Sequence, residues 1–403
     1  MKRFLCAAFA LATAVLSSSP AMAAPADAVR AFDRANESYQ QALAREGVVG
    51  GSVMLLGPRD LSELRHYGVA DRETGARVDA QSLFHWASVT KVFTGIAIMQ
   101  LVERGLLSLD DPAVRFLPQL RRVHNPYGPI EAITIRHLLS HSAGFRSPTW
   151  PWNMDGAAER SDAQPHEPAD WQQVEAMLPY TAVAFPPGSR ASYSNLGASL
   201  LGRIVELISG DPIQVYIDKN ILKPLGMTRT YFDATPWMMR ANRVRGYSLR
   251  DGALRAGPPE VMTGATVGNG GLNGPIEDMA KFVRFLMGDR RAFAILQPRT
   301  LEMMLQPQLE FERDDRRVVS IGLAFFISDE RGADGRIHRS YGHSGFQLGH
   351  RSTINFTRDG CCGFIFAANT ATSGGNPSAT QMRIDLVDHV FPLLRRQIRG
   401  ERR

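Results

Sequence analysis

The chain has little cysteine, little excess charge of either sign, and no long apolar run beyond its first residues. Three cysteines are too few for the disulfide framework of a small secreted domain. The formal net charge of +6 is mild, and no tract of Lys and Arg interleaved with aromatics occurs, so we expect no nucleic-acid partner. No later segment is apolar enough to predict a membrane span, which needs ~18 residues or more.

The first 23 residues have the three-part layout of a secretory signal peptide. A basic start, Met1-Lys2-Arg3, precedes an apolar run from Phe4 to Leu16 and the A-x-A site Ala21-Met22-Ala23. The run is too short to cross a bilayer. We therefore expect cleavage after Ala23 and a periplasmic or secreted product with no transmembrane segment.

Two cysteines remain after that cleavage, Cys361 and Cys362. Adjacent cysteines rarely pair, because a disulfide between them strains the intervening peptide. The pair lies in Cys-Cys-Gly-Phe-Ile-Phe-Ala-Ala, a segment typical of a buried strand. The sequence therefore favours two small, unpaired apolar side chains.

Strand patterns lie near both ends of the chain, with helical patterns between them. We expect strands at 50–56, 64–69, 318–327, 337–341, 345–355 and 363–368, and helices at 28–45, 88–103, 196–208 and 381–394. This order predicts an α+β fold, in which an antiparallel sheet built from both termini is flanked by helices and interrupted by a mostly helical domain. The sheet domain would comprise residues 24–110 and 261–403, the helical domain residues 111–260, and an active site would lie between them.

Residues 146–170 lack periodicity and are rich in Pro, Trp and polar residues. Loops of this length in compact domains are often functional lids or disordered insertions. Because the segment contains Trp150 and Trp152, one interpretation is that it forms a lid over a site.

The sharpest local pattern is Ser88-Val89-Thr90-Lys91 at the start of the apolar helix. Residues three apart on a helix share a face, so the Ser88 hydroxyl and the Lys91 amine can meet. A serine hydroxyl is a weak nucleophile until a base takes its proton. A lysine in an apolar helix can have its pKa lowered enough to serve as that base. Chance could still produce this spacing, so the pattern alone is weak.

Two further patterns are ambiguous by themselves. In Tyr193-Ser194-Asn195 the first and third side chains could face one cleft, or Asn195 could cap the following helix while Tyr193 packs. In His343-Ser344-Gly345 the glycine could let a substrate lie against a strand edge, or the segment could be an ordinary strand start.

In combination, the order Ser-x-x-Lys, Tyr-x-Asn, His-x-Gly resembles the serine β-lactamase and penicillin-binding-protein superfamily. The Tyr-x-Asn form is similar to class C β-lactamases, D-alanyl-D-alanine carboxypeptidases, D-aminopeptidases and family VIII carboxylesterases. The resemblance extends over residues 47–390. It includes Leu101 to Pro112, Ile133 to Phe145, and Asn269-Gly270-Gly271-Leu272 followed by Glu277-Asp278-Met279.

The resemblance implies a role for each motif residue. Ser88 would be the acylated nucleophile, Lys91 its activator and Tyr193 a proton shuttle. Asn195 would hold the substrate and Lys91. The oxyanion hole would use the backbone N–H groups of Ser88 and Phe346, and His343, Ser344 and Gly345 would line the substrate site.

His343 departs from the pattern of most β-lactamases in the superfamily, which have lysine there facing a substrate carboxylate. A histidine with an ordinary pKa near about 6.5 would hold such a carboxylate only at lower pH. We therefore expect a serine hydrolase acting through an acyl-enzyme on an ester or amide, as an esterase or a D-amino-acid peptidase. A β-lactamase is an alternative, and so is a non-catalytic sensor that binds penicillin or peptide.

No cofactor is expected, and the predicted partner is a small-molecule or peptide substrate. His137 and His141 have the spacing of two ligands in a zinc protease. The glutamate that such a site needs after the first histidine is replaced by Leu138. We therefore expect no metal site, and interpret both histidines as structural.

Overall fold

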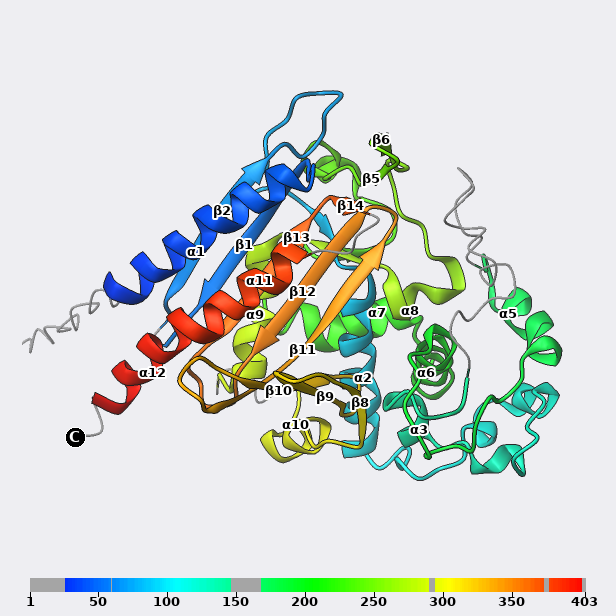
Figure 1. The fold of residues 1–403 in the computed structure, drawn as a ribbon. Coiled ribbons are helices and arrows are strands. Elements are labelled where there is room, and N and C mark those ends of the chain that lie inside the picture. The colour runs from blue at the N-terminus through cyan, green and yellow to red at the C-terminus, as the bar shows by residue number, and fades with distance from the viewer. Residues whose placement is uncertain (1–25, 59, 146–167, 290–293, 373–376, 401–403) are drawn as a thin grey trace, which may run out of the picture.

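An eight-stranded antiparallel sheet joins the two ends of the chain. The computed structural model describes residues 26–58, 60–145, 168–289, 294–372 and 377–400. The strand order is β2-β1-β13-β12-β11-β10-β9-β8, so an N-terminal hairpin pairs with β13 from the C-terminal part (Figure 1). The strands are β1 (Gly50–Leu56), β2 (Ser62–Gly68), β8 (Leu309–Arg313), β9 (Arg317–Ile321), β10 (Phe326–Arg331), β11 (Ile337–Gln347), β12 (His350–Phe356) and β13 (Gly363–Ala368).

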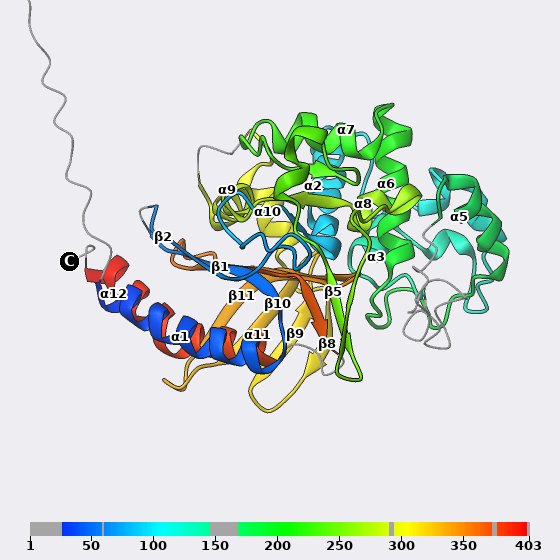
Figure 2. The same cartoon turned by 90° about the horizontal axis from the view of Figure 1, so that it is seen from above.

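Helices cover both faces of this sheet (Figures 1 and 2). On one face lie α1 (Ala26–Arg45), α11 (Pro377–Asp385) and α12 (Phe391–Gly400). On the other lie α2 (Thr90–Glu103), α9 (Ile276–Met287) and α10 (Pro298–Met304). This arrangement confirms the expected α+β fold with a sheet built from both ends of the chain.

Side chains of the central strands divide between two apolar cores. In β1, Met54 and Leu56 join the cluster that contains α2 and α9. Val53 and Leu55 join the cluster that contains α1 and α11. Because successive side chains of a strand point to opposite faces, a strand covered on both faces must be apolar almost throughout.

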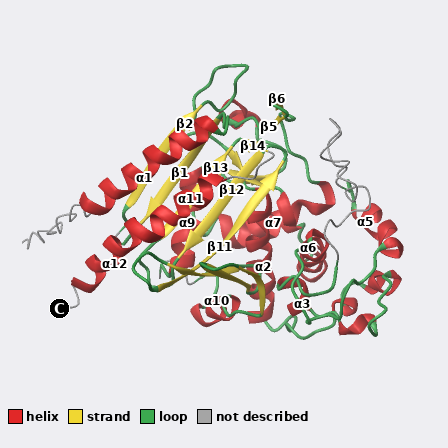
Figure 3. Cartoon of the chain, viewed as in Figure 1, coloured by secondary structure: helices red, strands yellow, loops and turns green. Residues whose placement is uncertain are grey.

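The remaining helices gather on the far side of α2 from α1 (Figure 3). They are α3 (Ile135–Leu139), α5 (Trp171–Met177), α6 (Asn195–Ser209), α7 (Ile213–Ile217) and α8 (Val267–Gly270). Two three-stranded sheets complete the fold. Their strands are β3 (Phe84–His85), β4 (Tyr231–Phe232), β5 (Tyr247–Arg250), β6 (Ala253–Ala256), β7 (Leu272–Gly274) and β14 (Thr370–Thr372).

Strand boundaries differ from the sequence expectation in two places. The expected strand 318–327 is two strands, β9 and β10, separated by a bend in which Ala324 has a φ of 63°. The segments 337–341 and 345–355 are divided differently, because β11 runs unbroken to Gln347 and turns at Leu348 and Gly349. Both turn residues have positive φ, 45° and 87°, as a tight hairpin requires. His343 therefore lies within a strand rather than at its start.

The expectation for the cysteines is wrong. Cys361 and Cys362 form a disulfide between adjacent residues, and both are fully buried beneath α12. They lie in the turn before β13, where the backbone is not held in a strand. An adjacent pair can close its ring there, which a regular strand would not allow.

Two sequence expectations fall partly or wholly outside the described residues: the signal peptide at 1–23 and most of the segment 146–170. Within the described ranges, no helix has both the length and the apolar character that a membrane crossing requires.

Candidate active site

Ser88 lies in a sharp turn between β3 and α2. The turn is a 3₁₀ segment, η1 (Ala87–Val89), that leads directly into the helix. Ala87 has a φ of 46°, a left-handed conformation that persists in a non-glycine residue only where its surroundings enforce it. The Trp86 amide donates to the Leu272 carbonyl (2.8 Å), and the Trp86 carbonyl accepts from Ser352 Oγ (2.7 Å). These bonds from distant strands fix the turn that presents Ser88.

Lys91 is the nearest charged partner of Ser88. Its side chain is buried, with 3% of the residue exposed. Its Nζ donates to Ser88 Oγ at 2.9 Å and to the backbone carbonyl of Asn269 at 2.9 Å. The Asn269 carbonyl in α8 therefore holds the amine beside the Ser88 hydroxyl, so the position of the amine does not depend on the lysine rotamer alone.

Tyr193 completes this cluster from the segment that precedes α6. Its hydroxyl lies near enough to Ser88 to interact with it, and Lys91 Nζ lies 5.2 Å from the centre of its ring. Burial raises the pKa of Tyr193 well above its usual value, against the smaller opposing effect of Ser88. The phenol therefore keeps its proton at neutral pH and can donate it.

His141 holds Tyr193 in place, a role that sequence reasoning missed. The His141 carbonyl accepts from the Ser192 amide (2.8 Å), and His141 Nδ1 accepts from the Ser194 amide (3.1 Å). The His141 and Tyr193 rings lie with their centres 4.6 Å apart. Burial, assisted by the nearby His343 and Lys91, lowers the pKa of His141 to about 3, so Nδ1 remains an acceptor. Both residues flanking Tyr193 are thus bonded to one histidine.

The two histidines that were weighed as metal ligands serve separate local structures. His137 belongs to the capping box of α3, where the Thr134 hydroxyl accepts from the His137 amide. His141 has a φ of 52° just after α3 and turns toward Tyr193. Its positive φ marks a constrained position, which no sequence pattern indicated.

Asn195 begins α6 but does not cap it. Ser194 is the N-cap, with its Oγ accepting from the Gly197 amide at 3.0 Å. Asn195 Oδ1 is buried without a hydrogen-bond partner among the described residues. The Asn195 carbonyl accepts from Ser199 Oγ, which in turn accepts from Asn269 Nδ2 (3.1 and 2.7 Å). Asn195 is thereby linked to the residue whose carbonyl holds Lys91.

Gly345 allows β11 to pass against the turn that carries Ser88. A Cβ at this position would lie 2.2 Å from the Trp86 carbonyl oxygen and 2.4 Å from Ser352 Oγ. Both distances are far below van der Waals contact, so only glycine fits without displacement of a backbone.

Ser344 and Phe346 point their side chains to the other face of β11, because strand side chains alternate. Ser344 Oγ lies 3.0 Å from Thr353 Oγ1. The Phe346 ring is 59% exposed, with the Arg351 guanidinium 4.7 Å from its centre. On the side of the strand that faces Ser88, these two residues present only their backbone groups.

His343 is a neutral group in this structure. Its Nδ1–H donates to the Ser344 carbonyl at 2.7 Å, a bond that requires the proton on Nδ1 because a carbonyl only accepts. Burial, together with the nearby Lys91 Nζ, lowers the pKa of His343 to about 3. Its Nε2 is buried and unpartnered within the described part of the chain. This pKa replaces the value near 6.5 that the sequence alone suggested.

Aromatic rings extend from this cluster along the edge of the sheet. Phe326 of β10 lies 5.2 Å from His343 and 6.3 Å from Tyr193 between ring centres. Phe311 of β8 continues the row, 5.3 Å from Phe326. Sequence reasoning named neither phenylalanine, because each lies on a strand far from the motifs.

Comparison with known proteins places the chain in a family. The model of the family described as Beta-lactamase matches residues 35–389, so the chain belongs to this family of serine hydrolases.

Individual proteins share parts of the sequence or the fold. Esterase EstB of Burkholderia gladioli is 33% identical over 208 residues, a match that spans 50% of this chain and 51% of EstB. The octameric penicillin-binding protein homologue from Pyrococcus abyssi aligns with a TM-score of 0.74 and 27% identity, over 87% of this chain and 75% of that one. The D-amino acid amidase from Ochrobactrum anthropi SV3 aligns with a TM-score of 0.68 and 22% identity, over 88% and 98%, and this likeness concerns the fold alone.

Proposed function

We propose that this protein is an exported serine hydrolase that cleaves a neutral ester, or a related amide, through an acyl-enzyme on Ser88. The observation that carries the proposal is the cluster in which Ser88 Oγ meets Lys91 Nζ at 2.9 Å and lies near the Tyr193 phenol. A hydroxyl between an amine and a phenol has both a group that can take its proton and a group that can supply one.

The reaction proceeds in two balanced steps. Ser88 Oγ attacks the carbonyl carbon while its proton moves to the amine form of Lys91, and the leaving alcohol departs with a proton supplied through Tyr193. Water then attacks the acyl-enzyme, and the acid leaves as the Ser88 hydroxyl is restored. The backbone N–H groups of Ser88 and Phe346 are the proposed oxyanion donors, a contribution worth a few kcal/mol of barrier.

The surroundings of His343 favour an uncharged substrate. A carboxylate held against this residue would need a cation, but the imidazole is neutral above about pH 3. The aromatic rings of Phe326 and Phe311 offer apolar contact instead. The 33% identity with a relative named as an esterase supports the ester over the amide.

Two alternatives follow from particular observations. A β-lactamase ranks lower because β-lactams carry a carboxylate that His343 is not charged to hold. A non-catalytic binding protein ranks lower because Ser88, Lys91 and Tyr193 are all present and in contact. Export rests on the signal-peptide pattern of residues 1–23, and the proposed location is the periplasm or the exterior.

The test combines labelling with turnover. Wild-type protein should take up a fluorophosphonate probe on Ser88 and hydrolyse short p-nitrophenyl esters faster than nitrocefin or D-amino-acid peptides. Ser88→Ala should lose label and turnover while keeping its circular dichroism spectrum. Label on another serine in that variant would disprove the assigned nucleophile, and stoichiometric label without turnover would favour the binding protein.

A further inference from the structure

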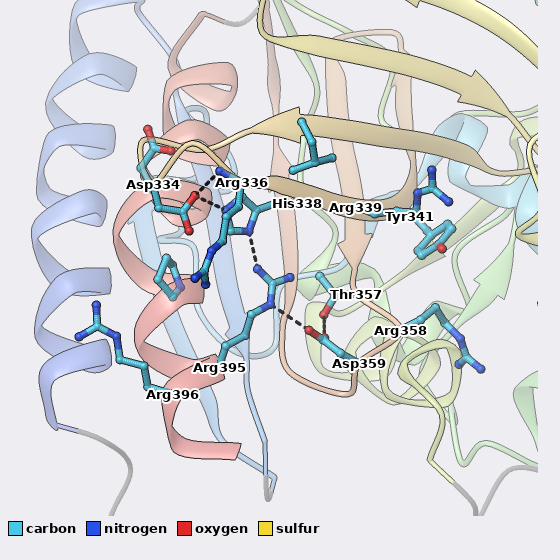
Figure 4. A pocket seen from close by; sticks show the side chains of 13 residues that line it. Asp334, Arg336, His338, Arg339, Tyr341, Thr357, Arg358, Asp359, Arg395 and Arg396 are labelled. Atoms are coloured by element: carbon cyan, nitrogen blue, oxygen red, sulfur yellow. Dashed lines mark hydrogen bonds and ion pairs between the residues drawn. The ribbon is translucent and has the colours of Figure 1, made fainter. Parts of the chain in front are cut away.

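A cavity separate from the site around Ser88 lies where the β10–β11 and β12–β13 turns meet α12 (Figure 4). Its volume is about 760 Å³, within the range of about 300–1,000 Å³ that is typical of small-molecule sites. It shares no lining residue with the cluster around Ser88. The walls are Asp334, Arg336, Ile337, His338, Arg339, Tyr341, Thr357, Arg358, Asp359, Asp388, Pro392, Arg395 and Arg396.

Arg395 is fixed in this cavity from two sides. Its Nε donates to Asp359 Oδ2 (2.9 Å) and its Nη1 to His338 Nδ1 (2.5 Å). Since an arginine only donates, His338 carries its proton on Nε2, which lies 3.0 Å from Asp334 Oδ1. Figure 4 shows this chain of bonds across the cavity. Arg395 Nη2 has no hydrogen bond to the described residues, so it remains available to a ligand.

Arginines neutralise two of the three carboxylates of the cavity. Asp359 binds Arg395. Asp334 accepts from the neutral His338 and therefore keeps its charge, and the His338 bond and the nearby Arg336 lower the pKa of that carboxyl. Asp388 accepts two bonds from Arg316 Nη2, at 2.8 and 2.9 Å, although Arg316 is not part of the wall. Asp334 is thus the one aspartate of the wall whose charge is left for a further arginine, Arg336, to balance.

The arginines, by contrast, exceed their partners. Arg339 is paired with Asp329 and Arg358 with Glu302, both outside the wall. Arg336 and Arg396, which are exposed, form no close ion pair among the described residues, although Arg336 helps to lower the pKa of Asp334. The cavity therefore contains one uncompensated guanidinium group, that of Arg396, and two further groups with free donors, Arg336 and Nη2 of Arg395.

We propose that this cavity binds a phosphate monoester. A phosphate group is anionic at neutral pH and has three acceptor oxygens, one for each of these three donor groups. A carboxylate has only two acceptor oxygens. The side chains of Ile337, Tyr341 and Pro392 give the organic part of the ester an apolar wall. The site is independent of hydrolysis at Ser88.

Isothermal titration calorimetry at low salt tests the proposal with glucose 1-phosphate, inorganic phosphate and glucose. We expect one equivalent of glucose 1-phosphate to bind, more tightly than inorganic phosphate and with an affinity that falls as NaCl is added. Glucose should give no heat. The double variant Arg336→Ala/Arg396→Ala should bind at least tenfold more weakly, whereas Arg240→Ala, at an exposed arginine outside the cavity, should bind as the wild type does.

Each contrary result has a definite meaning. Absence of binding, or equal affinity in the double variant, would overturn the site. Equal affinity for inorganic phosphate and the ester would overturn the monoester and leave a phosphate-ion site. Ser88→Ala should bind glucose 1-phosphate normally, and the double variant should keep its ester hydrolysis. Failure of the phosphate site can therefore be distinguished from failure of the proposed hydrolase.

Discussion

Changing the pH should not alter how the protein discriminates between a carboxylate-bearing ester and a neutral ester of the same size. His343 is the residue expected to face that carboxylate, and its burial keeps the imidazole neutral with a pKa of about 3. Protonation could help only below that pH, because a lowered pKa means that the neutral form persists into acid. The ratio of kcat/KM for the two esters is the quantity to follow, since it cancels titrations that both substrates share.

The size of the change in this ratio with pH distinguishes the buried histidine from one with an ordinary pKa. With a pKa of about 3, about 0.3% of His343 is protonated at pH 5.5 and far less at pH 8. With a pKa of about 6.5, the protonated fraction would fall from about 90% to about 3%, and the ratio would drop about thirtyfold. We therefore expect the measured ratio to change by less than about twofold.

The assay is initial-rate hydrolysis of the two p-nitrophenyl esters, followed from pH 5.5 to 8 with correction for nitrophenol ionisation. His343→Lys places a cation at the same position and should raise the carboxylate ratio by about tenfold or more, the scale of a charge-assisted hydrogen bond. A thirtyfold decline in the wild type would refute the assignment of a neutral His343. No gain from the lysine would refute its placement against the substrate carboxylate.

The other predictions concern groups around the nucleophile. Lys91→Arg should be about as inactive as Lys91→Ala in steady-state turnover, because arginine cannot release a proton at accessible pH; near-normal activity would mean that Lys91 acts only as a fixed charge. His141→Ala should lower kcat by about tenfold to a hundredfold with little change in KM, and His141→Asn, which tolerates positive φ, should recover part of it; a change confined to KM would contradict a role in positioning Tyr193. Gly345→Ala should lower both activity and the melting temperature because its Cβ would lie 2.2 Å from the Trp86 carbonyl, whereas Gly202→Ala in α6, whose Cβ would meet nothing closer than 3.7 Å, should be neutral or stabilising. Equal melting temperatures for these two glycine variants would show that β11 can shift to accommodate the added Cβ at little cost in stability.

Local patterns determined much of the architecture. Apolar runs and glycine turns predicted strands near both ends of the chain, and the structure joins them in a single sheet. The contact between Ser88 and Lys91 was also predictable, because residues three apart on a helical turn share a face. These features depend on neighbours in the sequence, so the sequence specifies them directly.

Long-range contacts decided the boundaries within those elements. Cys361 and Cys362 lie in a turn that lets them join, although the sequence pattern included them in a buried strand. The turn at Leu348 and Gly349, rather than a break before Gly345, sets where β11 ends. A strand pattern gives the same alternation on either side of a bend, and the partner strands determine where the bend falls.

Only the tertiary structure decided how the site residues behave. His141 and Tyr193 come from separate segments, and their contact follows from how α3 and α6 pack. His343 looks like an ordinary titratable histidine in the sequence, yet the structure surrounds it with Lys91, Phe326 and Tyr193. Desolvation is a property of everything packed around a group, and most of what surrounds His343 comes from distant parts of the chain. Its charge state was therefore set by the fold, while the sequence determined only that an imidazole would be there.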